Sequence, residues 1–368
     1  MPRSVDCLFK PFAINEMDLA NRIVMAPMTR SFSPGNVPNE KVVDYYRRRA
    51  EGDVGLILTE GVSPNTVTAT GTPNVPNIVT DAAKAGWRAV TDAVHAANGK
   101  IGIQLWHEGP YRNPAKTDHP DTPSWSASGV KVPGKQLWEP MSETEIETAI
   151  TEFVEAAIAS KETGFDCVEF HGAHSYLLDS FFWDQTNLRG DQWGGGWEGR
   201  TAFACEIIRR SRAALGADYP LIIRLSQWKQ QDFTVNAAAS PDELTAWLTP
   251  LVDAGIDAFH CSQRRFWEPT FEGSDLNFAG WAKKLTGKPS ISVGSVGLSG
   301  DFTAIYGDNG GSEPASLDGL IDRMERDEFD LIAVGRALLK DPEWVVKVRE
   351  GRTGDLMTFD KSDLMTLY

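Results

Sequence analysis

The feature that most constrains the fold of this chain is an alternation of eight short β-type runs with longer stretches that favour helix. The runs are mostly apolar and continuous, which is typical of parallel strands buried on both faces. The expected strands are 22–27 (RIVMAP), 54–59 (VGLILT), 100–105 (KIGIQL), 167–171 (CVEFH), 221–225 (LIIRL), 258–261 (AFHC), 290–293 (SISV) and 330–334 (DLIAV).

Amphipathic helices are expected between these runs. The clearest covers 142–163, where Ser142 and Glu145 have the spacing of a capping box and apolar residues then recur at helical intervals. The same reasoning predicts helices over 81–97, 200–215, 241–254 and 315–325. Gly164, Gly216 and Gly255 lie where helices should end.

Eight β/α alternations predict either a doubly wound sheet or a closed barrel. The 368 residues could form two average domains or one large barrel. The count of eight, without a linker or a change of composition, favours an α/β fold of the (β/α)8 TIM-barrel class, with residues 1–368 as a single domain. Two connections are too long for plain loops. Segment 107–141 predicts a lid or hairpin inserted after the third strand, and segment 294–314 predicts a surface excursion.

The net charge and the cysteine content indicate which partners and which cellular compartment to expect. A net charge of -15 argues against nucleic acid or an anionic membrane surface as partner. No apolar stretch approaches the roughly 20 residues that span a bilayer, and no signal peptide is expected. The four cysteines are scattered, which argues against a disulfide framework, a zinc ribbon or an iron–sulfur cluster. We therefore expect a cytoplasmic protein.

The fourth strand ends in an unusual polar segment, HGAHSYLLD, which contains His171, His174 and Tyr176. In barrels of this class, chemistry takes place at the carboxyl ends of the strands. Strand alternation would place the two histidines on opposite faces, but Gly172 and Ala173 permit a turn that returns His174 and Tyr176 to the barrel mouth. Two imidazoles can donate N–H bonds to one carbonyl oxygen, and a tyrosine hydroxyl can supply a proton.

Other interpretations of this segment remain open. The histidines could be core residues or metal ligands, although His107 and His260 are the only further histidine candidates and follow no ligand spacing. No metal is expected. A metal-dependent hydrolase on the same barrel is nevertheless the alternative function, because this fold hosts many activities.

The segment HGAHSYLLDSFF resembles the most diagnostic segment of the old yellow enzyme family, and the resemblance extends over nearly the whole chain. It implies that His171 and His174 bind the activating group of the substrate and that Tyr176 donates a proton. The stretch IGIQLWHEG further implies that Trp106 lies beside the substrate.

The resemblance also implies a non-covalent FMN site built from several strand ends. LANRIVMAPMTR, LILTEGVSPN, IGIQLWHEG and LIIRLS match the parts that line the flavin ring, while ISVGSVG and LIAVGRALL match the phosphate site. Arginine beside the ring would stabilise reduced flavin, and arginine at the phosphate would bind its oxygens. The implied cofactor-binding residues are Pro27, Met28, Thr29, Gly61, Gln104, Arg224, Gly294, Ser295, Gly335 and Arg336.

The activity implied is reduction of electron-poor alkenes, with NADPH or NADH reducing FMN. Enones, maleimides, quinones and nitro compounds are the expected substrates, and the protein is expected to be a monomer or a homodimer. A flavin-binding module without turnover is a further possibility, against which the intact His171, His174 and Tyr176 set argues. The dienoyl-CoA reductase type is not expected, because these 368 residues have neither the cysteines nor the length for its cluster domain.

The sequence departs from the family pattern at segment 189–200. Trp193 stands where the family has tyrosine, and Gly196 and Gly199 replace serine and asparagine. These changes leave the conformation of this segment open. The run QRRFW at 263–267, after the sixth strand, is also distinctive and could contribute to ligand access or form a solvated loop.

Overall fold

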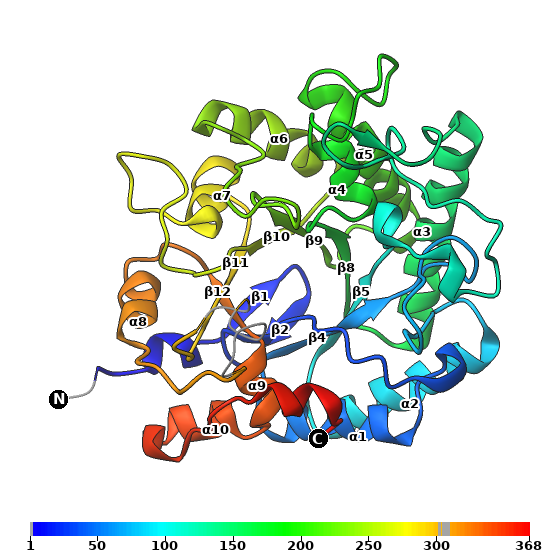
Figure 1. Ribbon diagram of the computed structural model, residues 1–368. Helices are drawn as coiled ribbons and strands as arrows, with labels where there is room; N and C mark the ends of the chain where they lie inside the picture. Colours follow the sequence, from blue (N-terminus) through cyan, green and yellow to red (C-terminus); the bar gives the residue numbers. More distant parts are fainter. Residues whose placement is uncertain (1–2, 301–302, 304–309) are drawn as a thin grey trace.

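A closed barrel of parallel strands forms the centre of the computed structural model, which describes residues 3–300, 303 and 310–368 (Figure 1). Around the barrel the strands follow their order along the chain. They are β3 (Ile23–Met25), β4 (Leu56–Val62), β5 (Ile101–Leu105), β8 (Cys167–Gly172), β9 (Leu221–Ser226), β10 (Ala258–Ser262), β11 (Ser290–Val293) and β12 (Leu331–Val334). The predicted (β/α)8 fold and its eight strands are confirmed, with ends that differ by at most three residues.

Helices cover the outside of the barrel, as Figure 1 shows. The capping box of Ser142 and Glu145 opens α3, and Gly164 and Gly255 end α3 and α6 in the left-handed conformation, as the sequence predicts. The helices are α1 (Glu40–Glu51), α2 (Asp81–Ala96), α3 (Glu143–Thr163), α4 (Leu177–Phe182), α5 (Trp197–Leu215), α6 (Pro241–Ala254), α7 (Phe278–Thr286), α8 (Asp318–Glu325), α9 (Arg336–Lys340) and α10 (Trp344–Arg349). None of the helices in the described part of the chain is long and apolar enough to cross a membrane.

A short hairpin, β1 (Phe12–Ile14) and β2 (Met17–Leu19), closes one end of the barrel and was not predicted. Its buried side chains Ile14, Met17 and Leu19 pack into the apolar cluster inside the barrel. Burying each such side chain contributes about 1.5–3 kcal/mol. The interior is therefore apolar and sealed at this end, which leaves polar chemistry to the opposite end.

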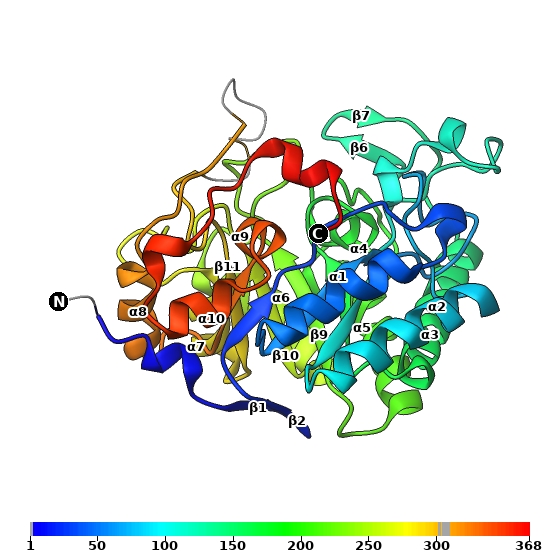
Figure 2. The same cartoon turned by 90° about the horizontal axis from the view of Figure 1, so that it is seen from below.

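A second hairpin, β6 (Val130–Val132) and β7 (Lys135–Gln136), lies at that opposite end (Figure 2). It confirms the insertion expected after the third barrel strand. The other long connection, 294–314, falls partly outside the described residues, Gly307 included. Its described ends pair with each other through a bridge between Leu298 and Pro314.

Candidate active site

A cavity of about 590 Å³ opens at the carboxyl ends of the barrel strands. Its size falls within the usual range for small-molecule sites, and its position is where barrel enzymes hold their ligands. The lining includes many residues singled out from the sequence, namely Pro27, Met28, His174, Tyr176, Arg224, Gly294, Ser295, Gly335 and Arg336.

The two-residue period of the strands explains why polar groups reach this end of the barrel. In β8, Val168 and Phe170 belong to the core between strands and helices. The alternate residues Glu169 and His171 therefore point into the barrel. His171 is in register with Arg224 of β9, which faces inward by the same rule. The sequence CVEFH thus carries an inward polar pair within an otherwise apolar strand.

A left-handed turn follows β8 and brings His174 back over the cavity. His174 and Ser175 have φ of 62° and 64°, whereas Gly172 remains in the strand. The sequence correctly predicts a turn here, and its left-handed residues are His174 and Ser175. Left-handed backbone costs about 1–2 kcal/mol for a residue with a side chain. Other contacts must therefore hold this turn.

The three residues expected on the substrate side lie together. The ring centroids of His171 and His174 are 5.0 Å apart, and that of Tyr176 lies 5.1 Å from His171. Trp106 packs edge-on against Tyr176 at 5.1 Å. His174 and Tyr176 line the cavity directly, and His171 lies behind them with 5% of its surface exposed.

Both histidines are held neutral. Burial, reinforced by the positive charge of Arg224, lowers the pKa of His171 and of His174 well below the ordinary value. Each ring therefore carries one N–H at neutral pH. His174 Nε2 lies 2.8 Å from the hydroxyl of Ser262, while His171 Nδ1 is buried with no hydrogen-bond partner among the described residues.

Arg224 brings a buried positive charge to the cavity. Its Nε is buried without a hydrogen-bond partner in the part of the chain that the structure describes. Burial lowers its pKa, an effect that the charge of Glu169 opposes. A guanidinium in such a place gains most from an anionic or strongly accepting group in the cavity that it lines.

A buried network below the cavity orients Gln104. Gln104 Nε2 donates to Glu169 Oε1 at 2.7 Å, and Glu169 Oε2 lies 2.6 Å from His260 Nδ1. One N–H of Gln104 is therefore committed to Glu169, so a cofactor contact would use its carbonyl oxygen or its second N–H. His260, which the sequence left as a possible metal ligand, is here the partner of a carboxylate.

Backbone atoms crowd the cavity at the ends of β11 and β12. Gly294 has φ of 147°, and a Cβ there would come within 2.6 Å of the carbonyl oxygen of Gln263. Ser295 Oγ donates to the carbonyl of Arg264 at 2.9 Å. Arg336 extends along the same wall and donates to Ser312 Oγ at 3.1 Å and to the carbonyl of Gly300 at 2.5 Å.

Three predicted cofactor residues do not line the cavity. Thr29 is exposed. Gln104 lies inside the barrel, bonded to Glu169. A Cβ on Gly61 would come within 2.5 Å of the Trp106 ring, so the structure shows a packing reason for this glycine. The family resemblance had instead implied that Gly61 lies beneath the flavin.

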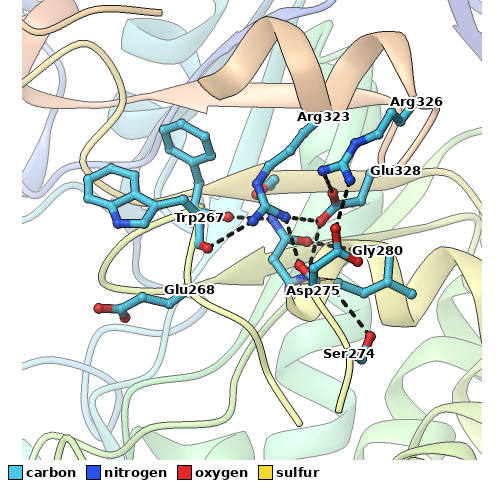
Figure 3. Close-up of polar contacts among 12 residues, drawn as sticks. Trp267, Glu268, Ser274, Asp275, Gly280, Arg323, Arg326 and Glu328 are labelled. Carbon is cyan, nitrogen blue, oxygen red and sulfur yellow. Dashed lines mark hydrogen bonds and ion pairs between the residues drawn. The ribbon is translucent and has the colours of Figure 1, made fainter. Parts of the chain in front are cut away.

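The segment after β10 forms another wall of the cavity, through Gln263 and Arg264. A buried cluster behind it fixes the following loop (Figure 3). Arg323 donates to the carbonyl of Trp267 at 2.9 Å and pairs with Glu328 at 2.5 Å. Glu328 also accepts the backbone N–H of Asn277. The distinctive run after the sixth strand is therefore part of the cavity wall at its first two positions.

Several cavity residues were missed by sequence reasoning, and the strand-end rule could have found some of them. Ser262 and Trp228 lie at or just beyond strand ends, and Gln230 and Phe233 follow on the same loop as Trp228. No sequence pattern indicated Leu364, because it reaches the cavity from the far end of the chain.

The atypical segment 189–200 has an ordinary helix start. Gly196 is the N-cap of α5 without a side-chain hydrogen bond. Arg200 donates to the carbonyl of Phe182 at 2.8 Å and lies 3.8 Å from the ring centroid of Trp197. Trp193 is 8% exposed. The changes at this segment therefore leave the cavity residues in place.

In the part of the chain that the structure describes, no group of three or more His, Cys, Asp or Glu side chains could hold a metal ion. His107 is buried, and its Nδ1 accepts the backbone N–H of Gly109 at 3.0 Å.

Comparisons with known proteins identify the family of this chain. The profile of the NADH:flavin oxidoreductase / NADH oxidase family matches residues 7–312. The chain is 32% identical to an NADH oxidase of Thermoanaerobacter brockii over 95% of its length, but spans only 52% of that protein. It is 42% identical to a chanoclavine-I aldehyde reductase of Penicillium roqueforti, over 60% of each protein.

Solved structures give the same assignment. A morphinone reductase in complex with tetrahydroNAD superimposes with a TM-score of 0.80 at 27% identity, over 97% of this chain and 93% of that one. An old yellow enzyme homologue from Zymomonas mobilis shares the fold with a TM-score of 0.80, over 98% and 96% of the two chains. The chain belongs to the NADH:flavin oxidoreductase / NADH oxidase family, the family of the old yellow enzymes.

Proposed function

We propose that residues 1–368 act as one FMN-dependent ene-reductase. It would take hydride from NADPH or NADH and reduce activated C=C bonds in enones, maleimides, quinones or nitro compounds. The observation that carries the proposal is the meeting of Arg224 with His174 and Tyr176 at one cavity, with His171 packed against both of these rings. A buried guanidinium and neutral N–H donors beside a phenol suit a flavin below a carbonyl substrate.

The cavity lining suits both the ring and the phosphate of FMN. Arg224 would stabilise negative charge on the ring, and Pro27, Met28 and His174 line the same cavity. Gly294, Ser295, Gly335 and Arg336 would hold the phosphate, because glycine lets backbone N–H groups approach it and arginine adds charged hydrogen bonds. The inward positions of Gln104 and Gly61 support only an indirect role for these two residues.

The residues on the substrate side would polarise the substrate carbonyl and protonate the substrate. FMN, when bound, supplies the acceptance and delivery of hydride. Neutral His171 and His174 would each donate an N–H to the substrate carbonyl and stabilise its developing negative charge. Tyr176 would then give its phenolic proton to the α-carbon. Trp106 packs against the Tyr176 ring and limits its movement.

Relatives support this class of substrate and reductant. Two relatives, a chanoclavine-I aldehyde reductase and a morphinone reductase, are named after carbonyl compounds. The structure of the morphinone reductase was solved in complex with tetrahydroNAD. Because the chain spans about half of the NADH oxidase and 60% of the aldehyde reductase, the substrate stays a proposal. The metal-dependent hydrolase alternative gains no support from these relatives or from the described side chains.

Purified protein tests the proposal directly. It should be yellow, release one FMN per chain on denaturation, bleach with NADPH or NADH in the absence of oxygen, and regain colour on adding cyclohexenone. Bleaching without return of colour would indicate a flavin-binding module that does not turn over this substrate class. Protein that stays colourless after incubation with FMN would contradict the proposal as a whole.

A further inference from the structure

The segment that follows β9, Trp228–Gln231, contacts the left-handed turn at successive positions. The ring of Trp228 stacks on that of His174, with centroids 4.6 Å apart. Gln230 Nε2 donates to the carbonyl of His174 at 2.6 Å, and its backbone N–H donates to Ser175 Oγ at 3.2 Å. Ser175 Oγ in turn donates to Gln231 Oε1 at 2.5 Å. These contacts bind both residues whose backbone is left-handed.

The remaining residue of the segment, Lys229, acts through a buried carboxylate. Lys229 and Asp179 form an ion pair in which both side chains are fully buried. Asp179 uses its other oxygen to accept the backbone N–H of Ser175 at 2.6 Å. The ring centroids of Trp183 and Trp247 lie 6.0 and 5.9 Å from the ammonium. The carboxylate therefore connects the lysine to the turn.

A contribution to stability does not by itself explain this ion pair. Burial lowers the pKa of Lys229 and raises that of Asp179, so in each case desolvation outweighs the attraction of the partner. Buried ion pairs are often no more stabilising than apolar side chains of the same volume. What an apolar pair could not provide is the acceptor for the Ser175 N–H.

We propose that Lys229, Asp179 and Gln230 are positioning residues that hold the His174–Ser175 turn in its left-handed form. They thereby fix the His174 ring over the cavity and Tyr176 at the start of α4. The consequence for ligand binding rests on the proposed function, whereas the hold on the turn itself does not depend on flavin.

Lys229→Met tests the pair, and Lys347→Met is its matched control. Lys347 also pairs with a buried carboxylate, Asp341, at 2.8 Å, but on α10 and away from the turn. Amide hydrogen exchange of the full chain is measured on peptides covering 172–180. We expect exchange at the Ser175 amide to rise about tenfold or more in Lys229→Met and to stay unchanged in Lys347→Met, because only the first loses the support of its acceptor.

Ligand binding gives a readout that general destabilisation would not move. FMN-loaded protein is titrated with para-hydroxybenzaldehyde and followed by its long-wavelength absorption band. We expect Lys229→Met to weaken binding about fivefold or more at unchanged FMN content, since the donors no longer share one geometry. The double change Lys229→Met with Asp179→Asn should recover much of the affinity, because the asparagine oxygen can accept from Ser175 without a buried charge.

Gln230→Ala provides a second route if Lys229→Met does not fold. It removes the donor to the His174 carbonyl, and we expect faster amide exchange over 172–180. Because Gln230 also lines the cavity, exchange is the decisive readout for this variant. Equal exchange and equal phenol affinity in wild type, Lys229→Met and Gln230→Ala would overturn the inference. A wild-type protein that binds no FMN would contradict the proposed function instead, and hydrogen exchange would still decide whether the segment holds the turn.

Discussion

Among single residues, Tyr176 is the group whose chemistry can be separated from its packing. Its ring lies edge-on to Trp106 at 5.1 Å and to Tyr111 at 5.9 Å, and these contacts need only the ring. Phenylalanine would therefore keep the position and remove the hydroxyl.

For Tyr176→Phe we expect flavin reduction by the nicotinamide to remain near the wild-type rate, because that step needs no proton from this residue. Reoxidation by cyclohexenone should slow by about 10²–10⁴-fold, the usual contribution of a positioned general acid. Stopped-flow absorbance resolves the two half-reactions. Quinones, which need no proton on that carbon, serve as the control oxidant, and wild-type reoxidation by cyclohexenone would assign the proton to another donor.

His174→Ala tests the paired donors. We expect para-hydroxybenzaldehyde to bind to the wild type as its phenolate and to lose both affinity and the charge-transfer band in the variant. Because burial holds the pKa of both histidines low, they stay neutral over about pH 6 to 9. Binding to the wild type should therefore strengthen as pH rises toward the phenol's own pKa. Phenol affinity unchanged in His174→Ala would show that the two rings do not act as a pair.

Among the structural elements, the end of β11 depends on a glycine that no other residue can replace. Gly294 has φ of 147°, and a Cβ on this residue would lie only 2.6 Å from a backbone oxygen. Gly134, between β6 and β7, has φ of 75° but open space around it. Both glycines have positive φ, but only at Gly294 would a Cβ collide with a backbone atom.

Gly294→Ala should therefore disturb the strand end that lines the cavity and lower FMN retention about tenfold or more, as loss of well-formed contacts to a charged group would do. Gly134→Ala should cost only backbone strain, about 1 kcal/mol, and leave FMN retention unchanged. Equilibrium dialysis against FMN, with thermal unfolding as a measure of strain, distinguishes the two. Equal FMN affinity in both variants would remove β11 from the cofactor site.

For the molecule as a whole, several buried histidines have lowered pKa values. Burial is the main cause for His107, with a pKa of about 3, and for His171, His174 and His260. In the unfolded chain each would bind a proton near pH 6.5, which the folded chain does not. Their contribution to stability is therefore complete above about pH 6.5 and is lost as pH falls below it.

Three carboxyl groups among the described residues oppose this trend. Burial raises the pKa of Glu60 and of Glu152 to about 7, so their contribution is complete below about pH 4.5 and is lost as pH rises from there to 7. Burial also raises the pKa of Asp179. Four histidines against three carboxyls leave a net loss on acidification. We expect the free energy of unfolding to fall between about pH 6.5 and 5, by up to about 1.4 kcal/mol per pH unit for each unopposed histidine.

Urea unfolding at a series of pH values measures this loss. The double variant Glu60→Gln with Glu152→Gln should lose stability more steeply on acidification than the wild type, because two of the three opposing carboxyls are gone. A stability that stays flat from pH 7.5 to about pH 5 would show that the buried histidines take up protons without unfolding.

The barrel and part of the cavity can be predicted from the amino-acid pattern alone. Alternation of apolar runs with amphipathic helices defines a (β/α)8 fold because each period is set by local backbone geometry. The rule that strand ends meet at one rim predicts that His171, His174 and Tyr176 lie at the barrel mouth. The family resemblance, and not the pattern, added Arg224, Gly294 and Arg336.

Features that depend on contacts between distant segments could be seen only in the folded molecule. The left-handed conformation of His174 and Ser175 follows from bonds to Trp228–Gln231, more than 50 residues away. Gly61 is required by the Trp106 ring, and Gln104 turns toward Glu169. No local pattern encodes such choices, because each is the lowest free energy of a packed arrangement and not of its own segment.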